Sequence, residues 1–305
     1  MAAPFGILNV NKPAGCTSRD VVSRIDRVTR PAKCGHAGTL DPLATGVLVV
    51  CVGQATRLIQ YVQRMPKRYE GTFLLGRRSP TDDLEGAVEL LANAAEPSRE
   101  AVERALPRFL GEVEQRPPAH SAIKVGGQRA YERARRGETV ELAARTITIH
   151  RLDIRRYEYP ELALSVECGS GTYVRSLGRD LAAALGTAAV MSALERTAIG
   201  EFDVADAVPL ADLSPESLKE HIRPALAAVA NLQRIELDAA QLVEIRHGRP
   251  ILMPRPLGVG PGTLPPAEAS SPGGEWAAID ASGELVAIVF PKRPGELWPR
   301  LNFGE

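Results

Sequence analysis

Asp41 is the acidic residue whose sequence setting most suggests chemistry. It lies in a glycine-flanked loop over residues 35–46 and directly precedes Pro42, which biases its backbone away from the helical region. The loop runs straight into an apolar strand expected at 47–52. A carboxylate on such a stiff support suits nucleophilic or general-base catalysis. The alternative is a structural turn, because an Asp before Pro commonly bonds its own backbone.

Arg175 falls in the first turn of a helix that we expect from about residue 172, with Leu177 and Leu181 in its apolar stripe. A cation at this end opposes the helix dipole and favours a nearby anion. A carboxylate or a phosphate could supply that anion. The alternative is a surface arginine that points into water.

Aromatic residues with basic neighbours form a third pattern. Lys67 and Arg68 directly precede Tyr69, and Tyr131 and Tyr173 also have cations nearby. Aromatic rings between cations can stack on unpaired bases while the cations neutralise phosphates. A tyrosine in a strand can equally be a half-buried packing residue.

Metal and nucleotide cofactors find little support in the sequence. Cys34 and His36 lie close to Asp41, but three mixed ligands on one loop, without a second His pair or a C-x-x-C, make a poor zinc site. The glycine motifs that bind nucleotide phosphates after a strand are missing from the sequence. We therefore expect neither a metal nor a cofactor.

The charge of the chain is balanced in total but uneven along its length. The 305 residues, 44% of them hydrophobic, carry 37 basic and 37 acidic side chains, and this length allows roughly two domains. Residues 1–80 have a net charge of +8 and residues 121–150 of +3, whereas residues 201–305 have −6. This distribution predicts one anion-facing surface on a neutral protein.

Export and membrane insertion are not predicted. The longest apolar run, residues 47–52, is far too short to span a bilayer, and no basic segment followed by an apolar stretch begins the chain. The four cysteines have irregular spacing, which favours reduced thiols. We expect a cytoplasmic protein.

The order of elements predicts an α+β body with a mixed, largely antiparallel sheet flanked by helices. Its first helix should begin near Thr17, where Thr17 and Asp20 form a capping box. The exposed face of that helix carries Arg19, Arg24 and Arg27. Further strands are expected at 69–75 and 162–168, and a helix at 98–110.

Two segments differ from this body. Residues 120–145 combine a Gly-Gly turn with a short Arg-rich helix and few apolar residues, which predicts a projecting element. Residues 233–305 predict a small β-rich domain with a hairpin at 276–290, interrupted by a flexible Pro/Gly-rich loop at 254–274. The expected domains are therefore 1–232 and 233–305.

Taken together, these blocks resemble the bacterial tRNA pseudouridine-55 synthases of the TruB type. Ordered matches over many blocks are more specific than any single motif. The resemblance covers residues 6–18, 35–46, 67–69, 76–86, 115–124, 131–137 and 171–177.

This resemblance implies isomerisation of one T-loop uridine of tRNA without metal or cofactor, by a monomer that needs no protein partner. Asp41 then corresponds to the catalytic aspartate, Arg175 to its ion-pair partner and Tyr69 to a catalytic ring that stacks on the target base. His36 corresponds to a residue that holds the flipped-out T-loop bases, and Leu194 to an apolar pocket contact. The remaining substrate-binding residues that it implies are Lys12, Lys67, Tyr173 and, in a thumb-like insertion, Arg129, Arg133, Arg135 and Arg136. Residues 233–305 are similar to the PUA domain of that family.

The sequence departs from the family pattern at one position, and two alternative functions remain open. Glu195 stands where the family usually has a second basic residue, which leaves Arg196 for a phosphate contact. The rivals are a noncatalytic tRNA-binding or RNA-folding protein on the same scaffold and a guide-RNA-dependent synthase. A hydrolase that uses Asp41 is a more remote alternative, which chelator-sensitive activity would reveal.

Overall fold

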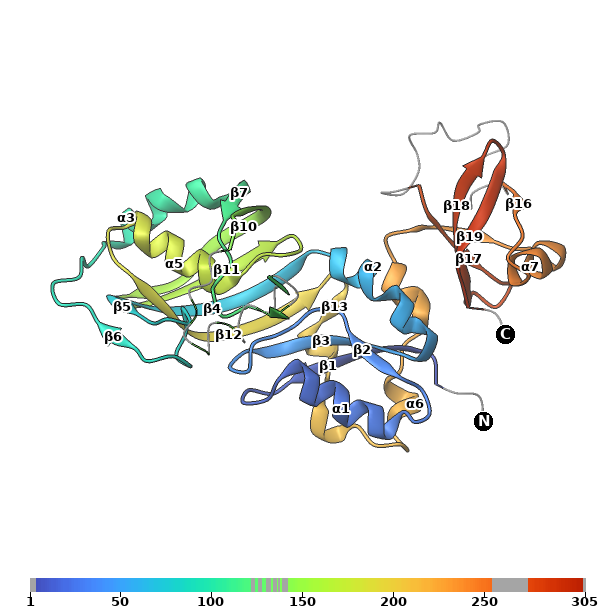
Figure 1. Ribbon diagram of the computed structural model, residues 1–305, viewed down its shortest axis with the longest axis horizontal. Coiled ribbons are helices and arrows are strands. Elements are labelled where there is room, and N and C mark those ends of the chain that lie inside the picture. Colours follow the sequence, from blue (N-terminus) through green and yellow to red (C-terminus); the bar gives the residue numbers. More distant parts are fainter. Residues whose placement is uncertain are drawn as a thin grey trace.

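The computed structural model describes residues 4–121, 124–125, 128–129, 133, 136, 138, 142–253 and 274–303. Within these residues, ten strands form one large mixed sheet and five strands form a second sheet. Figure 1 shows the second sheet beyond the end of the main body that carries α2. The predicted α+β class is confirmed.

The bounds of the elements are as follows. The large sheet contains β1 (Gly6–Lys12), β2 (Cys34–His36), β3 (Thr45–Val52), β4 (Lys67–Leu75), β7 (Gly111–Gln115), β10 (Arg145–Glu158), β11 (Glu161–Cys168), β12 (Ala189–Ile199), β13 (Phe202–Asp203) and β14 (Val208–Pro209). The second sheet contains β15 (Gln233–Glu236), β16 (Ile251–Leu252), β17 (Trp276–Ile279), β18 (Leu285–Arg293) and β19 (Glu296–Asn302). Two strand pairs stand apart, β5 (Arg77–Arg78) with β6 (Glu89–Leu90), and β8 (Lys124–Val125) with β9 (Gln128–Arg129). The α-helices are α1 (Ser18–Val28), α2 (Ile59–Arg64), α3 (Arg99–Ala105), α5 (Val174–Ala184), α6 (Leu218–His221) and α7 (Ala239–Arg246), and 3₁₀ turns cover Gly53–Leu58, Leu106–Phe109, Val204–Asp206, Leu210–Asp212 and Ala225–Val229.

The large sheet has the strand order β14-β1-β3-β12-β4-β11-β10-β7. Its neighbours run antiparallel except for β3 beside β12 and β1 beside β14. The parallel contact between β3 and β12 lies in the middle of the sheet. It brings the end of the Asp41 loop next to the strand that carries Leu194.

The strand β3 is apolar at nearly every position because both of its faces are covered. Val47, Val49 and Cys51 contribute to one hydrophobic cluster, whereas Leu48 and Val50 contribute to another. The second cluster also holds the apolar stripe of α1. A strand buried on both faces reads as a continuous apolar run, which is the pattern that predicted it.

The helix α1 begins as the sequence predicts. Thr17 is its N-cap, and the side chains and backbones of Thr17 and Asp20 form the reciprocal bonds of a capping box. The helix α5 begins at Val174, two residues later than expected, and packs closely on the sheet. A Cβ atom at Gly178 of α5 would lie 2.0 Å from the ring of Phe73, so this packing requires glycine.

The second sheet packs on the main body through a shared hydrophobic cluster. Ala277, Leu285 and Ile288 from that sheet join Leu58 and Ala228 from the body. The predicted hairpin is observed as β17 and β18. In the described ranges, no helix has the length and apolar character needed to cross a bilayer.

Several predictions fall outside the described residues. They concern most of the Arg-rich segment at 120–145, including Arg135 and the side chain of Arg129, and nearly all of the loop at 254–274. The described backbone of that first segment includes the antiparallel pair β8 and β9.

Candidate active site

The loop that carries Asp41 is fixed by its neighbours in the chain. The Ser18 hydroxyl accepts a hydrogen bond from the Leu40 N–H (2.8 Å) and donates one to the Leu40 carbonyl (3.1 Å). The Gly15 N–H donates to the Pro42 carbonyl at 2.9 Å. The residues on both sides of Asp41 are therefore held by the segment that starts α1.

Lys12 also holds the loop that carries Asp41. Its ammonium group donates to the carbonyls of Ala44 (2.6 Å), Pro13 (2.9 Å) and Pro42 (3.3 Å), and its side chain is fully buried. Burial lowers the pKa of Lys12, while the Asp41 carboxylate is among the groups that oppose this shift. In this structure the predicted substrate-binding lysine faces protein carbonyls.

Arg175 and Asp41 form an ion pair through two contacts. Arg175 Nε lies 3.0 Å from Asp41 Oδ2, and Nη2 donates to Oδ1 at 3.1 Å. The Arg175 side chain is 6% exposed, whereas 30% of the Asp41 side chain remains accessible. The tertiary fold thus supplies the anion that the helix-dipole argument requires for Arg175, and it leaves one side of the carboxylate open.

The rest of the Arg175 guanidinium is occupied by a second carboxylate and two carbonyls. Nη1 donates to Asp83 Oδ2 at 3.0 Å and to the Thr81 carbonyl at 2.7 Å. Nη2 also donates to the His120 carbonyl at 3.1 Å. Since the Asp83 side chain is only 1% exposed, this second pair is more deeply buried than the pair with Asp41.

The environment of Asp41 raises its pKa above that of an ordinary aspartate. Burial is the largest cause, the Arg175 guanidinium opposes it, and the neighbouring Asp83 carboxylate adds to the increase. One cation shared between two carboxylates compensates each of them only in part. Asp41 therefore accepts a proton more readily than an exposed aspartate does.

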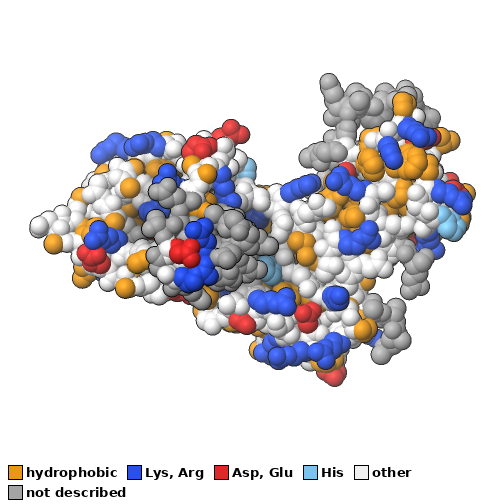
Figure 2. Space-filling model, in the orientation of Figure 1, with side chains coloured by type: hydrophobic (Ala, Val, Ile, Leu, Met, Phe, Trp, Pro, Cys, Tyr) orange, Lys and Arg blue, Asp and Glu red, His pale blue; other side chains and the backbone are white. Residues whose placement is uncertain are grey.

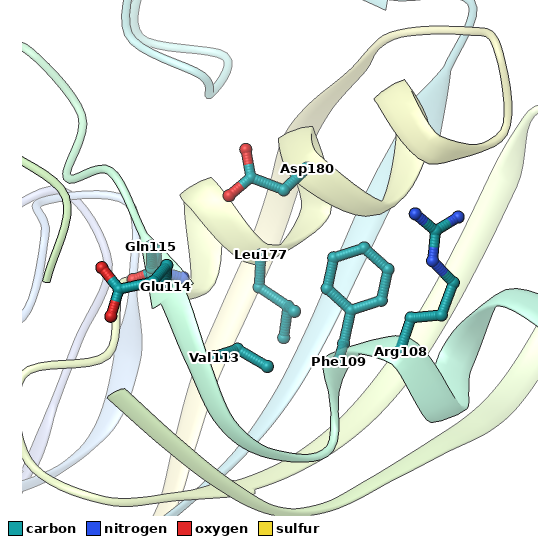
Figure 3. Close-up of a pocket in the computed structure, with 7 residues that line it drawn as sticks. All are labelled: Arg108, Phe109, Val113, Glu114, Gln115, Leu177 and Asp180. Carbon is teal, nitrogen blue, oxygen red and sulfur yellow. The ribbon is translucent and has the colours of Figure 1, made fainter. Parts of the chain in front are cut away.

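Gln115 holds the start of the helix that carries Arg175. Tyr173, the N-cap of α5, makes no side-chain capping bond. Instead, the Gln115 side chain accepts from the Tyr173 N–H (2.8 Å) and donates to the Tyr173 carbonyl (3.0 Å). Figure 3 shows Gln115 on β7 facing α5 beside a small pocket that Leu177 also lines.

Tyr69 and Leu194 form an apolar wall beside the ion pair. They lie on neighbouring strands, are 8% and 7% exposed, and share a hydrophobic cluster with Leu40. Burial raises the pKa of the Tyr69 phenol, and the Asp41 carboxylate adds to the increase, so the hydroxyl is protonated at neutral pH. The fold thus combines a carboxylate, a guanidinium, a phenol and apolar side chains in one place.

The sequence of this chain matches two family models. Residues 26–174 match the TruB family pseudouridylate synthase N-terminal domain, and residues 175–238 match the tRNA pseudouridylate synthase B C-terminal domain. The chain belongs to the TruB family. The resemblance drawn from the sequence blocks is therefore confirmed, and the protein is a pseudouridine synthase.

Curated relatives agree over almost the full length. The tRNA pseudouridine synthase B of Arthrobacter sp. (strain FB24) is 43% identical over 291 residues, which cover 93% of this chain and 92% of the relative. The tRNA pseudouridine synthase B of Corynebacterium efficiens is 40% identical over 301 residues, which cover 96% and 97%.

Solved structures share the fold of this TruB-family chain. A chain in the crystal structure of a Cbf5-Nop10-Gar1 complex has a TM-score of 0.70 and 26% identity, covering 94% of this chain and 78% of that one. A chain in an H/ACA RNP bound to a substrate RNA containing 2′-deoxyuridine has a TM-score of 0.71 and 23% identity, covering 99% and 86%. The second similarity concerns the fold alone.

Two other predicted residues of this TruB-family site lie in protected positions. The Gly38 N–H donates to His36 Nδ1 at 3.3 Å, and burial lowers the pKa of His36, so its imidazole is neutral at pH 7. Lys67 is 7% exposed, its ammonium group donates to the Gln63 carbonyl, and burial lowers its pKa to about 8. In the described part of the chain, no cluster of His, Cys, Asp or Glu has a metal-binding arrangement.

Tyr173 and the two thumb arginines whose side chains are described, Arg133 and Arg136, make intramolecular contacts. The Arg145 guanidinium lies 4.8 Å from the centre of the Tyr173 ring, so one face of that ring is already covered. Arg133 and Arg136 both pair with Glu138, at 2.6 and 2.9 Å. Phosphates that approached these two arginines would compete with this carboxylate.

The exposed basic face of α1 is observed. Arg19, Arg24 and Arg27 are all exposed on this helix. Figure 2 shows Lys and Arg side chains gathered over the region of α1. This surface has the charge that a polyanion requires.

Arg196 corrects one expectation, and two other residues were not singled out from the sequence. The expected phosphate contact of Arg196 is wrong, because its side chain is 2% exposed and its guanidinium bonds to interior carbonyls.

Asp83 lies in the matching block 76–86, and Gln115 begins another, but neither had a local signal for its role. Their importance follows from their contacts with Arg175 and Tyr173.

Proposed function

We propose that this enzyme converts uridine-55 in the T-loop of tRNA to pseudouridine, with Asp41 as the essential carboxylate. The observation that carries the proposal is the Asp41–Arg175 pair beside Tyr69 and Leu194. The names of the relatives at 40–43% identity support tRNA as the substrate.

The reaction exchanges one bond of the uracil for another. The bond from ribose C1′ to uracil N1 breaks, the ring turns over, and C1′ bonds to C5. N1 ends with a proton, and the C5 proton leaves. The Asp41 carboxylate can attack the sugar carbon, attack the base or remove a sugar proton, and each route requires its ionised form. Arg175 orients that carboxylate and favours its charge.

The uridine must leave its stack before this chemistry can begin. Extrusion of a base costs a few kcal/mol, which the pocket has to return by stacking and apolar contact. Tyr69 and Leu194 offer these surfaces beside the open side of Asp41. The protonated phenol of Tyr69 can donate a hydrogen bond to the base. It can assist the removal of the C5 proton only after its hydroxyl has passed its own proton to another group.

The basic face of α1 and the thumb arginines serve to hold the RNA backbone in this proposal. Phosphate neutralisation releases counterions, so salt weakens such binding steeply. The enzyme acts as a monomer in the cytoplasm, without a cofactor, a guide RNA or a protein partner.

Tritium release tests the proposal directly. Purified protein is incubated, with chelator present, with a tRNA transcript labelled at uracil C5, and the variant Asp41→Asn is measured alongside. We expect release of one label per tRNA from the wild type, none from the variant, and equal tRNA binding by both. A transcript with uridine-55 replaced by cytidine is the control for the site.

Two outcomes would contradict the proposal. Intact binding without release by the wild type would favour the noncatalytic RNA-binding alternative. Release of tritium that begins only after guide RNA or partner proteins are added would favour a guide-dependent synthase. The similarity of this chain to a chain of the Cbf5-Nop10-Gar1 complex is the reason to test this alternative.

A further inference from the structure

Arg196 is a buried cation without a carboxylate partner. Arg196 is 2% exposed. Among the described residues, no carboxylate forms an ion pair with its guanidinium. Burial of a charge is costly unless hydrogen bonds compensate it. The hydrogen bonds that compensate the buried Arg196 charge therefore indicate a role beyond packing.

The guanidinium of Arg196 binds the loop that carries Asp41. Nε donates to the Val47 carbonyl at 2.7 Å, Nη2 to the Gly38 carbonyl at 3.1 Å, and Nη1 to the Thr39 carbonyl at 3.5 Å. Gly38 and Thr39 precede Asp41 in this loop, and Val47 follows it. The planar fork of donors thus spans both ends of the loop.

The backbone of Arg196 fixes the end of the same loop. In the sheet register, Arg196 stands between Gly46 of β3 and Tyr69 of β4. Gly46 has a φ of +95°, and a Cβ atom there would lie 2.3 Å from the Arg196 carbonyl oxygen. Glycine is therefore required at this close approach.

Tyr69 is the cross-strand neighbour of Arg196 on β4. Tyr69 and Arg196 are directly opposite each other in the antiparallel register of β4 and β12, so their side chains lie on the same face of the sheet. The positive charge of Arg196 acts against the burial that raises the pKa of the Tyr69 phenol. Arg196 is therefore bonded to the Asp41 loop and paired across the sheet with Tyr69.

We propose that Arg196 is a positioning residue that fixes the distance and orientation between the Asp41 loop and the Tyr69 hydroxyl, so that both groups address the same uridine. The inference rests on the proposed function for its catalytic consequence. Arg196 does not contact the substrate. Lysine cannot replace it, because a single ammonium group cannot reach the carbonyls of Gly38, Thr39 and Val47 in the way that the three nitrogen atoms of the guanidinium do.

A double-mutant cycle measures this link. Single-turnover rate constants and tRNA dissociation constants are determined for the wild type, Arg196→Lys, Tyr69→Phe and the double variant. We expect Arg196→Lys to lower the rate constant at least about tenfold and to leave tRNA affinity within about twofold. The loss caused by Tyr69→Phe should be several-fold smaller in the Arg196→Lys background, because the hydroxyl is then already misplaced. Additive losses, or an unchanged rate constant in Arg196→Lys, would overturn the proposal.

Hydrogen–deuterium exchange gives a readout that does not depend on activity. Peptides that cover residues 37–47 should exchange faster in Arg196→Lys than in the wild type, whereas the exposed-pair control Arg99→Lys should leave them unchanged. Unchanged exchange in Arg196→Lys would refute the anchoring of the loop. If the wild type releases no tritium but exchange still accelerates, the proposed function fails and the anchoring of the loop stands.

A second variant covers the case in which Arg196→Lys does not fold. Gly38→Ala places a Cβ atom 3.5 Å from Arg196 Nη1, which is ordinary contact, although the φ of +144° at Gly38 disfavours alanine. The same cycle with Tyr69→Phe should again be non-additive. Additivity in a folded Gly38→Ala would overturn the proposal.

Discussion

The substitution Arg175→Lys tests whether the geometry of the cation, rather than its charge, supports catalysis. Arg175 reaches both Asp41 oxygens, Asp83 and the carbonyls of Thr81 and His120 through three nitrogen atoms. An ammonium group keeps the charge but donates from one point only. It can therefore serve one carboxylate well and must leave the others less well bonded.

The size of the effect follows from the bonds that are lost. A hydrogen bond to a charged group contributes about 1.5–3 kcal/mol. Loss of one of the two contacts to Asp41 should lower the single-turnover rate constant about tenfold to a hundredfold, since about 1.4 kcal/mol corresponds to a factor of ten. Affinity for tRNA should not change, because the Arg175 side chain is only 6% exposed and its guanidinium is taken up by protein groups.

The assay is tritium release under single turnover at saturating enzyme, with tRNA affinity measured by filter binding. Arg99→Lys is a matched control, because Arg99 forms an exposed pair with Glu103, a type that contributes only about 0–1 kcal/mol. A rate constant for Arg175→Lys within about twofold of the wild type would refute the reasoning. So would a loss that appears entirely in tRNA affinity.

Three further predictions follow from the same contacts. Because the pKa of Asp41 is raised in the folded state, ionised Asp41 costs stability near pH 7. Asp41→Asn should therefore melt no lower than the wild type at pH 7, with an advantage that shrinks as pH falls through the folded pKa; a variant that is less stable at pH 7 would contradict this sign. Lys12→Met removes the donor to two carbonyls of the Asp41 loop, those of Pro42 and Ala44, and to the Pro13 carbonyl. It should lower the rate constant more than tRNA affinity, whereas a pure affinity loss would indicate direct substrate contact. Gln115→Leu leaves the Tyr173 N–H and carbonyl unpaired and should cost about 1–3 kcal/mol in denaturant unfolding; an unchanged midpoint would contradict this.

Local sequence patterns predict much of the fold because their causes are local. The capping box of Thr17 and Asp20 sets the start of α1 whatever lies around it. The apolar run of β3 predicts a buried strand, since few soluble surfaces tolerate it. The turn before β18 follows from its Asp280–Gly283 sequence.

Local sequence patterns predict only part of the candidate site. Asp41 stands out through Pro42 and the adjacent glycines, and Arg175 through its place in the first turn of a helix. The partners that hold them do not stand out. Asp83 is one of several acidic residues in a polar connection, and Gln115 ends a short strand.

What the sequence by itself determined, then, is where helices and strands begin, which loop holds a stiff carboxylate, and which family the chain resembles. What only the tertiary structure decided is which charges are buried and paired. Arg196 looks like a surface cation in the sequence, but the parallel contact of β12 with β3 places it inside, under the Asp41 loop. The physical reason is that the cost of a buried charge depends on donors and acceptors far away in the chain, and only the folded sheet brings them within hydrogen-bonding distance.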